Sequence, residues 1–153
     1  MKPVTITPES PDTAAARDLI AELEAELTPL YPPESRHGYS VEKLLLENVA
    51  FFLVRESGAP AGCGGIQLMD GAYGELKRMY VRPPYRGTGL AKLMLQHLAD
   101  YAQGRGISVL RLETGIHQRA AIAFYESLGF RRIPPFGTYQ EDPMSRFYER
   151  HLP

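Results

Sequence analysis

The stretch from Tyr80 to Ala91 constrains the fold more than any other part of the sequence. An apolar, strand-like run ends at Val81, two prolines and a glycine-containing turn follow, and helical apolar spacing begins at Leu90. The first amides of a helix have no acceptors within the helix, and the helix dipole makes that end partly positive. Glycines in such a turn let an anionic ligand approach the main chain. The sequence therefore predicts a strand–loop–helix site for a phosphate group.

Basic residues gather around this loop although the formal net charge of the chain is only −1. Between Glu75 and Lys92, the cations are Lys77, Arg78, Arg82, Arg86 and Lys92. A phosphorylated small ligand fits this local field, whereas the overall charge gives no attraction for nucleic acid or for an anionic membrane. The loop has the spacing of neither a Walker loop nor a dinucleotide-binding fingerprint.

The length of 153 residues predicts one domain, residues 1–153. No apolar run approaches the roughly 20 residues of a membrane span, and the first residues do not resemble a secretory signal. We therefore expect a cytoplasmic protein that does not enter a membrane. The single cysteine, Cys63, lies in a strand-like run and is expected to be a buried apolar residue.

The pattern along the chain predicts a mixed α/β (α+β) domain. After a short strand at residues 4–6, the expected helices are 11–27, 40–46, 90–103 and 120–128, and the expected strands are 51–54, 61–69, 73–81, 107–113, 130–133 and 145–149. Simple alternation along 73–81 places Glu75, Lys77, Met79 and Val81 on one face, and Leu76, Arg78 and Tyr80 on the other.

Two motifs carry a resemblance to a known family. Arg86-x-x-Gly89-x-Ala91 resembles the pyrophosphate loop of the GNAT N-acetyltransferases, and Gln118-x-x-Ala121 with Tyr125 and Gly129-Phe130 resembles the second segment of that family. Many relatives have asparagine where Gln118 stands, which puts that one contact in doubt. Within the family, residues 75–81, 112–115 and 134–137 resemble a bacterial subgroup of YsnE-like acetyltransferases.

The resemblance implies a GNAT fold, with a mixed, mostly antiparallel sheet of about seven strands flanked by helices. It implies that acetyl-CoA is the cosubstrate, that the protein is an N-acetyltransferase, and that the acetyl group passes directly to an amine. The cofactor contacts that it implies are Met79, Tyr80, Val81, Arg86, Gly87, Thr88, Gly89, Leu90, Ala91, Gln118 and Tyr125.

Catalytic roles follow from the same resemblance. Tyr125 is expected to protonate the departing thiolate, and Glu75 is the leading candidate for the base that deprotonates the amine. Glu113 is the rival base, and His37 or His117 could relay a proton or be solvated loop residues. No spacing of histidine, cysteine and carboxylate residues predicts a metal site.

The acceptor is the least constrained part of the prediction. We expect a small-molecule amine that also carries a carboxylate, such as an amino acid, with Arg78 and Arg111 as candidate partners for the carboxylate. Acetylation of a protein amine is an alternative. A protein that binds acyl-CoA as a sensor without turning it over is another alternative. The sequence leaves open whether the protein is a homodimer.

Overall fold

Seven strands form one sheet in the order β1-β2-β3-β4-β5-β7-β6. The structure is a computed structural model and describes residues 2–153. Only β4 and β5 pair in parallel, so the mixed, mostly antiparallel sheet predicted from the sequence is confirmed. The strands are β1 (Val4–Pro8), β2 (Ala50–Glu56), β3 (Ala59–Met69), β4 (Tyr73–Val81), β5 (Val109–Gly115), β6 (Arg131–Ile133) and β7 (Ser145–His151).

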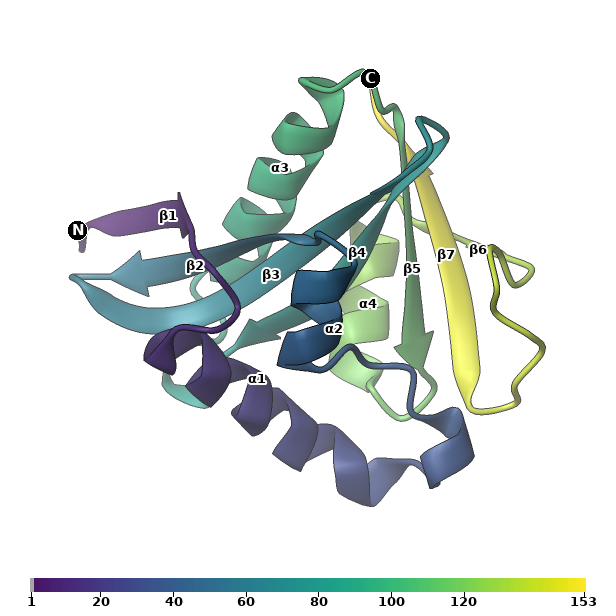
Figure 1. Cartoon of the computed structure of the whole chain (residues 1–153), viewed down its shortest axis with the longest axis horizontal. Coiled ribbons are helices and arrows are strands. Elements are labelled where there is room, and N and C mark those ends of the chain that lie inside the picture. The colour runs from purple at the N-terminus through teal and green to yellow at the C-terminus, as the bar shows by residue number, and fades with distance from the viewer. Residues whose placement is uncertain (1) are drawn as a thin grey trace.

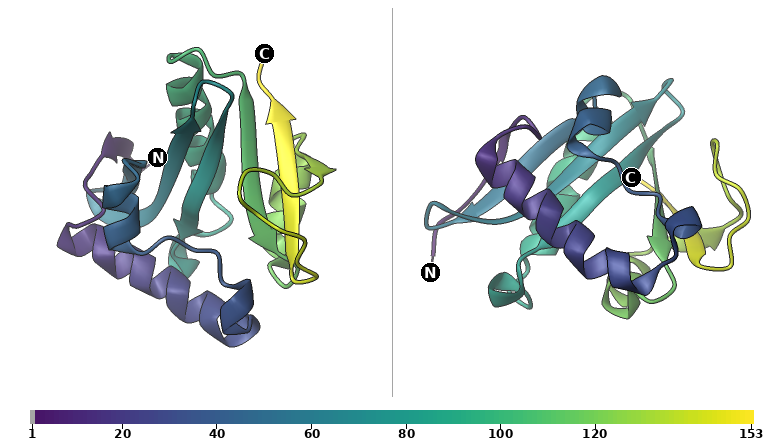
Figure 2. Two further views of the ribbon diagram at one scale, coloured as in Figure 1. Left: turned by 45° about the vertical axis from the view of Figure 1, so that its right-hand side comes forward. Right: turned by 60° about the horizontal axis from the view of Figure 1, so that its bottom comes forward.

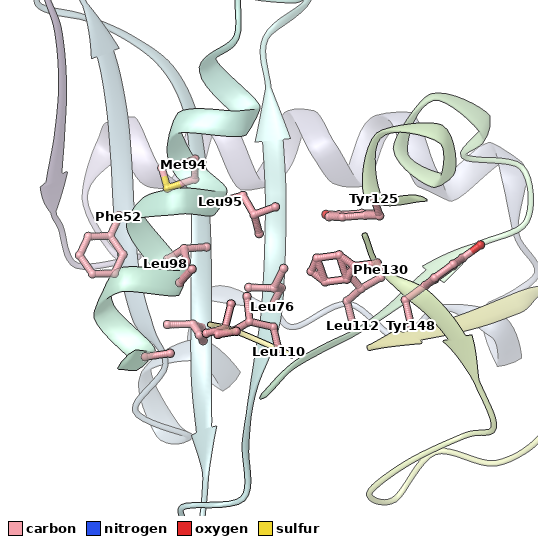
Figure 3. Close-up of a cluster of buried hydrophobic side chains, with 14 of the residues drawn as sticks. Phe52, Leu76, Met94, Leu95, Leu98, Leu110, Leu112, Tyr125, Phe130 and Tyr148 are labelled. Carbon is pink, nitrogen blue, oxygen red and sulfur yellow. The ribbon is translucent and has the colours of Figure 1, made fainter. Parts of the chain in front are cut away.

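Helices cover both faces of this sheet (Figures 1 and 2). The α-helices are α1 (Ala14–Leu27), α2 (Val41–Leu46), α3 (Leu90–Gln103) and α4 (Arg119–Ser127). One apolar cluster joins α1 and α2 to β2 and β3, and a larger one joins α3 and α4 to the opposite face. Figure 3 shows part of this larger cluster, in which Leu76 and Leu110 of the sheet lie near Leu95 and Leu98 of α3, and Leu112 lies beside Phe130. None of the helices within residues 2–153 is long and apolar enough to cross a membrane.

Capping explains where the first two helices begin. The Thr13 side chain accepts a hydrogen bond from the Ala16 amide, and the Ser40 side chain accepts one from the Lys43 amide. Helix α1 therefore starts at Ala14, three residues later than the sequence predicted. Strand β5 also starts later than expected, because the Ile107 amide bonds to the Ala102 carbonyl and closes the end of α3.

A β-bulge in β4 makes the predicted alternation wrong beyond Lys77. Cys63 pairs with Tyr80 and Gly65 pairs with Lys77, so Gly64 alone opposes both Arg78 and Met79. Arg78 adopts a positive φ of 55° at this point.

The bulge exchanges the faces of the residues that follow it. Met79 and Val81 join Leu76 in the cluster beneath α3, whereas Tyr80 packs in the cluster beneath α1. Arg78 also turns toward α1, where it pairs with Glu24. The last residues of the strand thus turn Arg78 and Tyr80 toward α1, and Met79 and Val81 toward α3.

Strands β4 and β5 share only two register pairs, Gly74 with Leu110 and Glu75 with Arg111. Beyond these pairs the strands separate toward the carboxyl end of β5, as the left view of Figure 2 shows. Two cavities lie at this separation.

Candidate active site

Two cavities adjoin at the separation of β4 from β5, and Met79, Gln118 and Tyr125 line both of them. The large cavity has a volume of about 670 Å³ and lies among the end of α1, the loop after β4, the start of α3 and helix α4. The small cavity, of about 130 Å³, lies toward the segment that joins α1 to α2. This arrangement suits a long ligand whose reactive end meets a small second ligand.

The loop after β4 forms an anion site at one end of the large cavity. Gly87 and Gly89 have positive φ values of 78° and 89°, and a Cβ added at either would meet no atom within 4 Å. Gly89 is the N-cap of α3, so the first amides of this helix, which have no acceptors within the helix, adjoin the cavity. Arg86, Gly87, Gly89, Leu90 and Ala91 all line it.

Two residues of the loop have contacts that sequence reasoning did not predict. The Arg86 guanidinium donates to the Val81 carbonyl at 2.7 Å and pairs with Glu26 of α1 at 2.8 Å. A phosphate bound here would therefore share Arg86 with Glu26. Thr88 is not among the residues that line the large cavity, and its hydroxyl donates to the Tyr85 carbonyl.

The large cavity fits the predicted cosubstrate in its chemistry. Its anion site consists of main-chain amides with Arg86 and Lys92 beside them, which suits a pyrophosphate. The rest of its lining is mostly aliphatic and aromatic, including Leu23, Leu27 and Phe124, which suits a flexible apolar arm.

Tyr125 lies at the junction of the two cavities. Its ring packs against Phe124 and Phe130, with centroid distances of 5.3 and 5.4 Å. Figure 3 shows the Tyr125 and Phe130 rings. Burial raises the pKa of the Tyr125 phenol well above its ordinary value of 10.0, so the phenol keeps its proton at neutral pH. A protonated phenol therefore lies where the two cavities meet.

The remaining predicted contacts of the cosubstrate are Met79, Tyr80, Val81 and Gln118, and all four line the large cavity. Met79 and Val81 line the large cavity beside the bulge, where the strand ladder is locally interrupted. Tyr80 also lines it, but its hydroxyl bonds to Glu22 of α1 at 3.2 Å. The Gln118 side-chain oxygen accepts from the Gly115 amide at 2.9 Å, which leaves its amide nitrogen for a ligand.

The small cavity contains a buried, closely bonded set of polar groups. The Lys77 ammonium donates to Glu75 Oε2 at 2.8 Å, and the Tyr139 hydroxyl donates to the same oxygen at 2.6 Å. The Lys77 nitrogen also lies 3.8 Å from the centroid of the Tyr39 ring. Both charged side chains are buried, with 6% of Lys77 and 5% of Glu75 exposed. The candidate base Glu75 is thus half of a buried ion pair.

Glu113, the rival base, has different surroundings in the same cavity. Its Oε2 accepts a hydrogen bond from the Ser145 hydroxyl at 2.8 Å. Burial raises the pKa of the Glu113 carboxyl, against smaller opposing effects of this hydrogen bond and of nearby cations.

The two predicted arginine partners of the acceptor have different positions. Arg78 lines the small cavity, donates to the Tyr39 carbonyl at 2.8 Å and pairs with Glu24. Arg111 lines neither cavity, because it pairs with Glu149 at 2.8 Å and stacks over the Tyr73 ring. The structure therefore does not bring Arg111 to the site.

Sequence reasoning missed Arg36, which lines the small cavity. Its guanidinium donates to the carbonyls of Tyr31 and Thr28 at 3.0 and 3.1 Å. Lys77 and Arg78 also line this cavity, and each pairs with a carboxylate. Arg36 has no carboxylate within 4.0 Å among residues 2–153. Arg36 lies in a loop that contains two prolines and a glycine, and nothing in the local sequence distinguishes it from other loop arginines.

Comparison with known proteins identifies a family for most of the chain. Residues 17–130 match the model of the acetyltransferase (GNAT) family. The IAA acetyltransferase of Azospirillum brasilense is 42% identical over 153 residues, which are 99% of this chain and 100% of that protein. The uncharacterized N-acetyltransferase YsnE of Bacillus subtilis is 38% identical over 88% of this chain and 90% of its own.

Solved structures agree with the fold. A candidate acyl-CoA N-acyltransferase of Klebsiella pneumoniae has a TM-score of 0.82 and 38% identity, with 97% of each chain covered. The PaiA N-acetyltransferase of Thermoplasma acidophilum, solved in complex with coenzyme A, has a TM-score of 0.78 at 21% identity, with 98% of this chain and 99% of that chain covered.

Proposed function

This chain belongs to the GNAT acetyltransferase family, and we propose that its acceptor is the amine of a small molecule that also carries a carboxylate. As a family member it is an acetyl-CoA-dependent N-acetyltransferase. The observation that carries the proposal is the position of Arg36, a cation without a carboxylate partner, on the wall of the small cavity. A cytoplasmic location, expected from the sequence, is also part of the proposal, and cell fractionation would test it.

The residues at the two ends of the large cavity have complementary tasks. We propose that the loop from Arg86 to Ala91 holds the pyrophosphate, and that the Met79 main chain and Gln118 hold the acyl end. Bound acetyl-CoA supplies a thioester, whose carbonyl carbon accepts the amine. The protein orients this group toward the small cavity.

Charge in the small cavity favours an acceptor with a carboxylate. Lys77 is neutralised by Glu75 and Arg78 by Glu24, so neither offers an unpaired cation. The Arg36 guanidinium has five N–H donors, and it donates hydrogen bonds to two main-chain carbonyls. The remaining donors suit an acceptor carboxylate. The modest volume of about 130 Å³ favours a molecule of amino-acid size.

An acceptor screen tests this proposal. The standard amino acids, their amides and short peptides are incubated with acetyl-CoA, and released thiol is measured. We expect kcat/KM for the best amino acid to exceed that for its amide by about tenfold, the low end of a charge-assisted hydrogen bond of about 1.5–3 kcal/mol. The Arg36→Ala variant should lose this preference.

Arg111→Ala is the matched control, because this arginine lines neither cavity. It should keep the preference of the wild-type protein. Equal use of amino acid and amide by the wild-type protein would show that carboxylate recognition is wrong. A peptide that outperforms every amino acid would favour a protein amine instead.

We further propose that Tyr125 donates its proton to the sulfur that leaves when the thioester is broken. The Tyr125→Phe substitution should lower kcat by about 10²-fold, a typical contribution of a general acid. Affinity for CoA, measured by isothermal titration, should stay near the wild-type value. Tyr73→Phe is the control, since this tyrosine packs outside both cavities. An unchanged kcat in Tyr125→Phe would exclude the role.

A further inference from the structure

The small cavity contains three carboxylates that could receive a proton from an acceptor ammonium: Glu24, Glu75 and Glu113. Glu24 is paired with Arg78, and 43% of its side chain is exposed. Glu75 accepts from both Lys77 and Tyr139 through one oxygen. Protonation of Glu75 would leave the buried Lys77 ammonium without its counter-charge, which is unfavourable. Glu24 and Glu75 are therefore not suited to act as the base.

Protonation of Glu113 would not break an ion pair. Within residues 2–153, the only side chain that hydrogen-bonds to it is the neutral hydroxyl of Ser145. It lies two residues beyond Arg111, where β5 has separated from β4. It lines the same cavity as Tyr125. The titratable groups that face Glu113 from neighbouring elements are Tyr31 and His37 before α2, Glu75 and Lys77 of β4, and Tyr139 before β7.

A histidine in the same cavity offers a route from Glu113 to solvent. His37 lines the same cavity as Glu113, and 26% of its side chain is exposed. Its Nε2 lies 3.1 Å from Asp142 Oδ2. The other oxygen of Asp142 accepts from the Ser35 hydroxyl at 3.1 Å and from the Met144 amide at 2.9 Å. Asp142 is thus fixed in place and holds the imidazole.

We propose that Glu113 is the base of this enzyme, and that His37, held by Asp142, carries the proton from Glu113 to solvent. The inference rests on the proposed amine acceptor. An N–H bond of the ammonium breaks as an O–H bond forms on Glu113, which leaves a neutral amine to attack the carbonyl. The proton then passes to the imidazole, whose charge Asp142 stabilises, and leaves to water. Glu75 instead positions Lys77 and Tyr139.

The dependence of kcat/KM on pH tests the assignment of Glu113. Since burial raises the pKa of Glu113 above its ordinary value of 4.5, the wild-type rate should fall as the pH drops through that raised pKa. Glu113→Gln should lose about 10²-fold in kcat/KM and lose this acidic limb. The Glu75→Gln/Lys77→Met double variant, which removes both charges of the pair, should keep the limb.

The substrate in this test is whichever amino acid or amide the enzyme acetylates fastest in the acceptor screen. The test therefore still applies if the screen shows that the acceptor needs no carboxylate. An acidic limb that persists in Glu113→Gln and disappears in the double variant would overturn the inference in favour of Glu75.

A second measurement tests the route through His37. His37→Gln should lower kcat by several-fold with KM nearly unchanged, and added imidazole should restore much of the rate. Asp142→Asn should shift the pH dependence without being rescued. An activity of His37→Gln equal to wild type, or a loss that imidazole does not restore, would exclude the relay.

Discussion

Replacing Glu75 with glutamine is expected to lower the free energy of unfolding by about 3–5 kcal/mol, the usual cost of removing one partner from a buried ion pair. The Lys77 ammonium would stay buried, with 6% of its side chain exposed, and would face a neutral amide in place of a carboxylate. Burial already lowers the pKa of Lys77, and Glu75 offsets part of that effect. Urea unfolding, extrapolated to water, measures the change.

Two control variants make this result specific. Glu75→Gln combined with Lys77→Met removes both charges and should recover most of the lost stability. Glu26→Gln breaks the exposed pair with Arg86, in which 47% of the arginine and 42% of the glutamate side chain are exposed. It should cost about 1 kcal/mol or less. Equal effects of Glu75→Gln and Glu26→Gln would contradict a structural role for the Glu75–Lys77 pair.

The architecture could be predicted because local patterns agree with it over most of the chain. The strand at 73–81 was predicted with the bounds that β4 has, since apolar residues end at two prolines. The loop that follows was recognised because two glycines stand between a strand and a helix, where a ligand can approach the main chain. The structure adds that Gly87 and Gly89 both have a positive φ. The comparisons then confirmed the family that these motifs indicated.

The partners of the charged side chains could not be predicted, because they depend on contacts between distant segments. One extra residue in β4 reverses the faces of Arg78 and Met79, and no local signal marks that bulge. Arg111 was a reasonable candidate until its partner Glu149 was placed beside it on β7. Glu75 has the residue type of a base, but its pairing with Lys77 changes its chemistry.

Replacing Gly89 with valine is expected to weaken CoA binding by roughly 10³-fold. A side chain at this N-cap would stand over the first amides of α3, which line the large cavity. Each hydrogen bond to a charged group contributes about 1.5–3 kcal/mol, so losing two of them corresponds to about 10²–10⁴ in the dissociation constant. Isothermal titration with CoA measures the change.

The substitution also strains the backbone, because a β-branched residue is unfavourable at a φ of 89°. Gly58→Val separates this strain from the loss of the anion site. Gly58 has a φ of 82°, has nothing within 4 Å of an added Cβ, and lies in the turn between β2 and β3, outside both cavities. Both variants should lose similar stability in urea, but only Gly89→Val should lose affinity for CoA. A CoA affinity within threefold of wild type in Gly89→Val would show that the pyrophosphate does not bind at the start of α3.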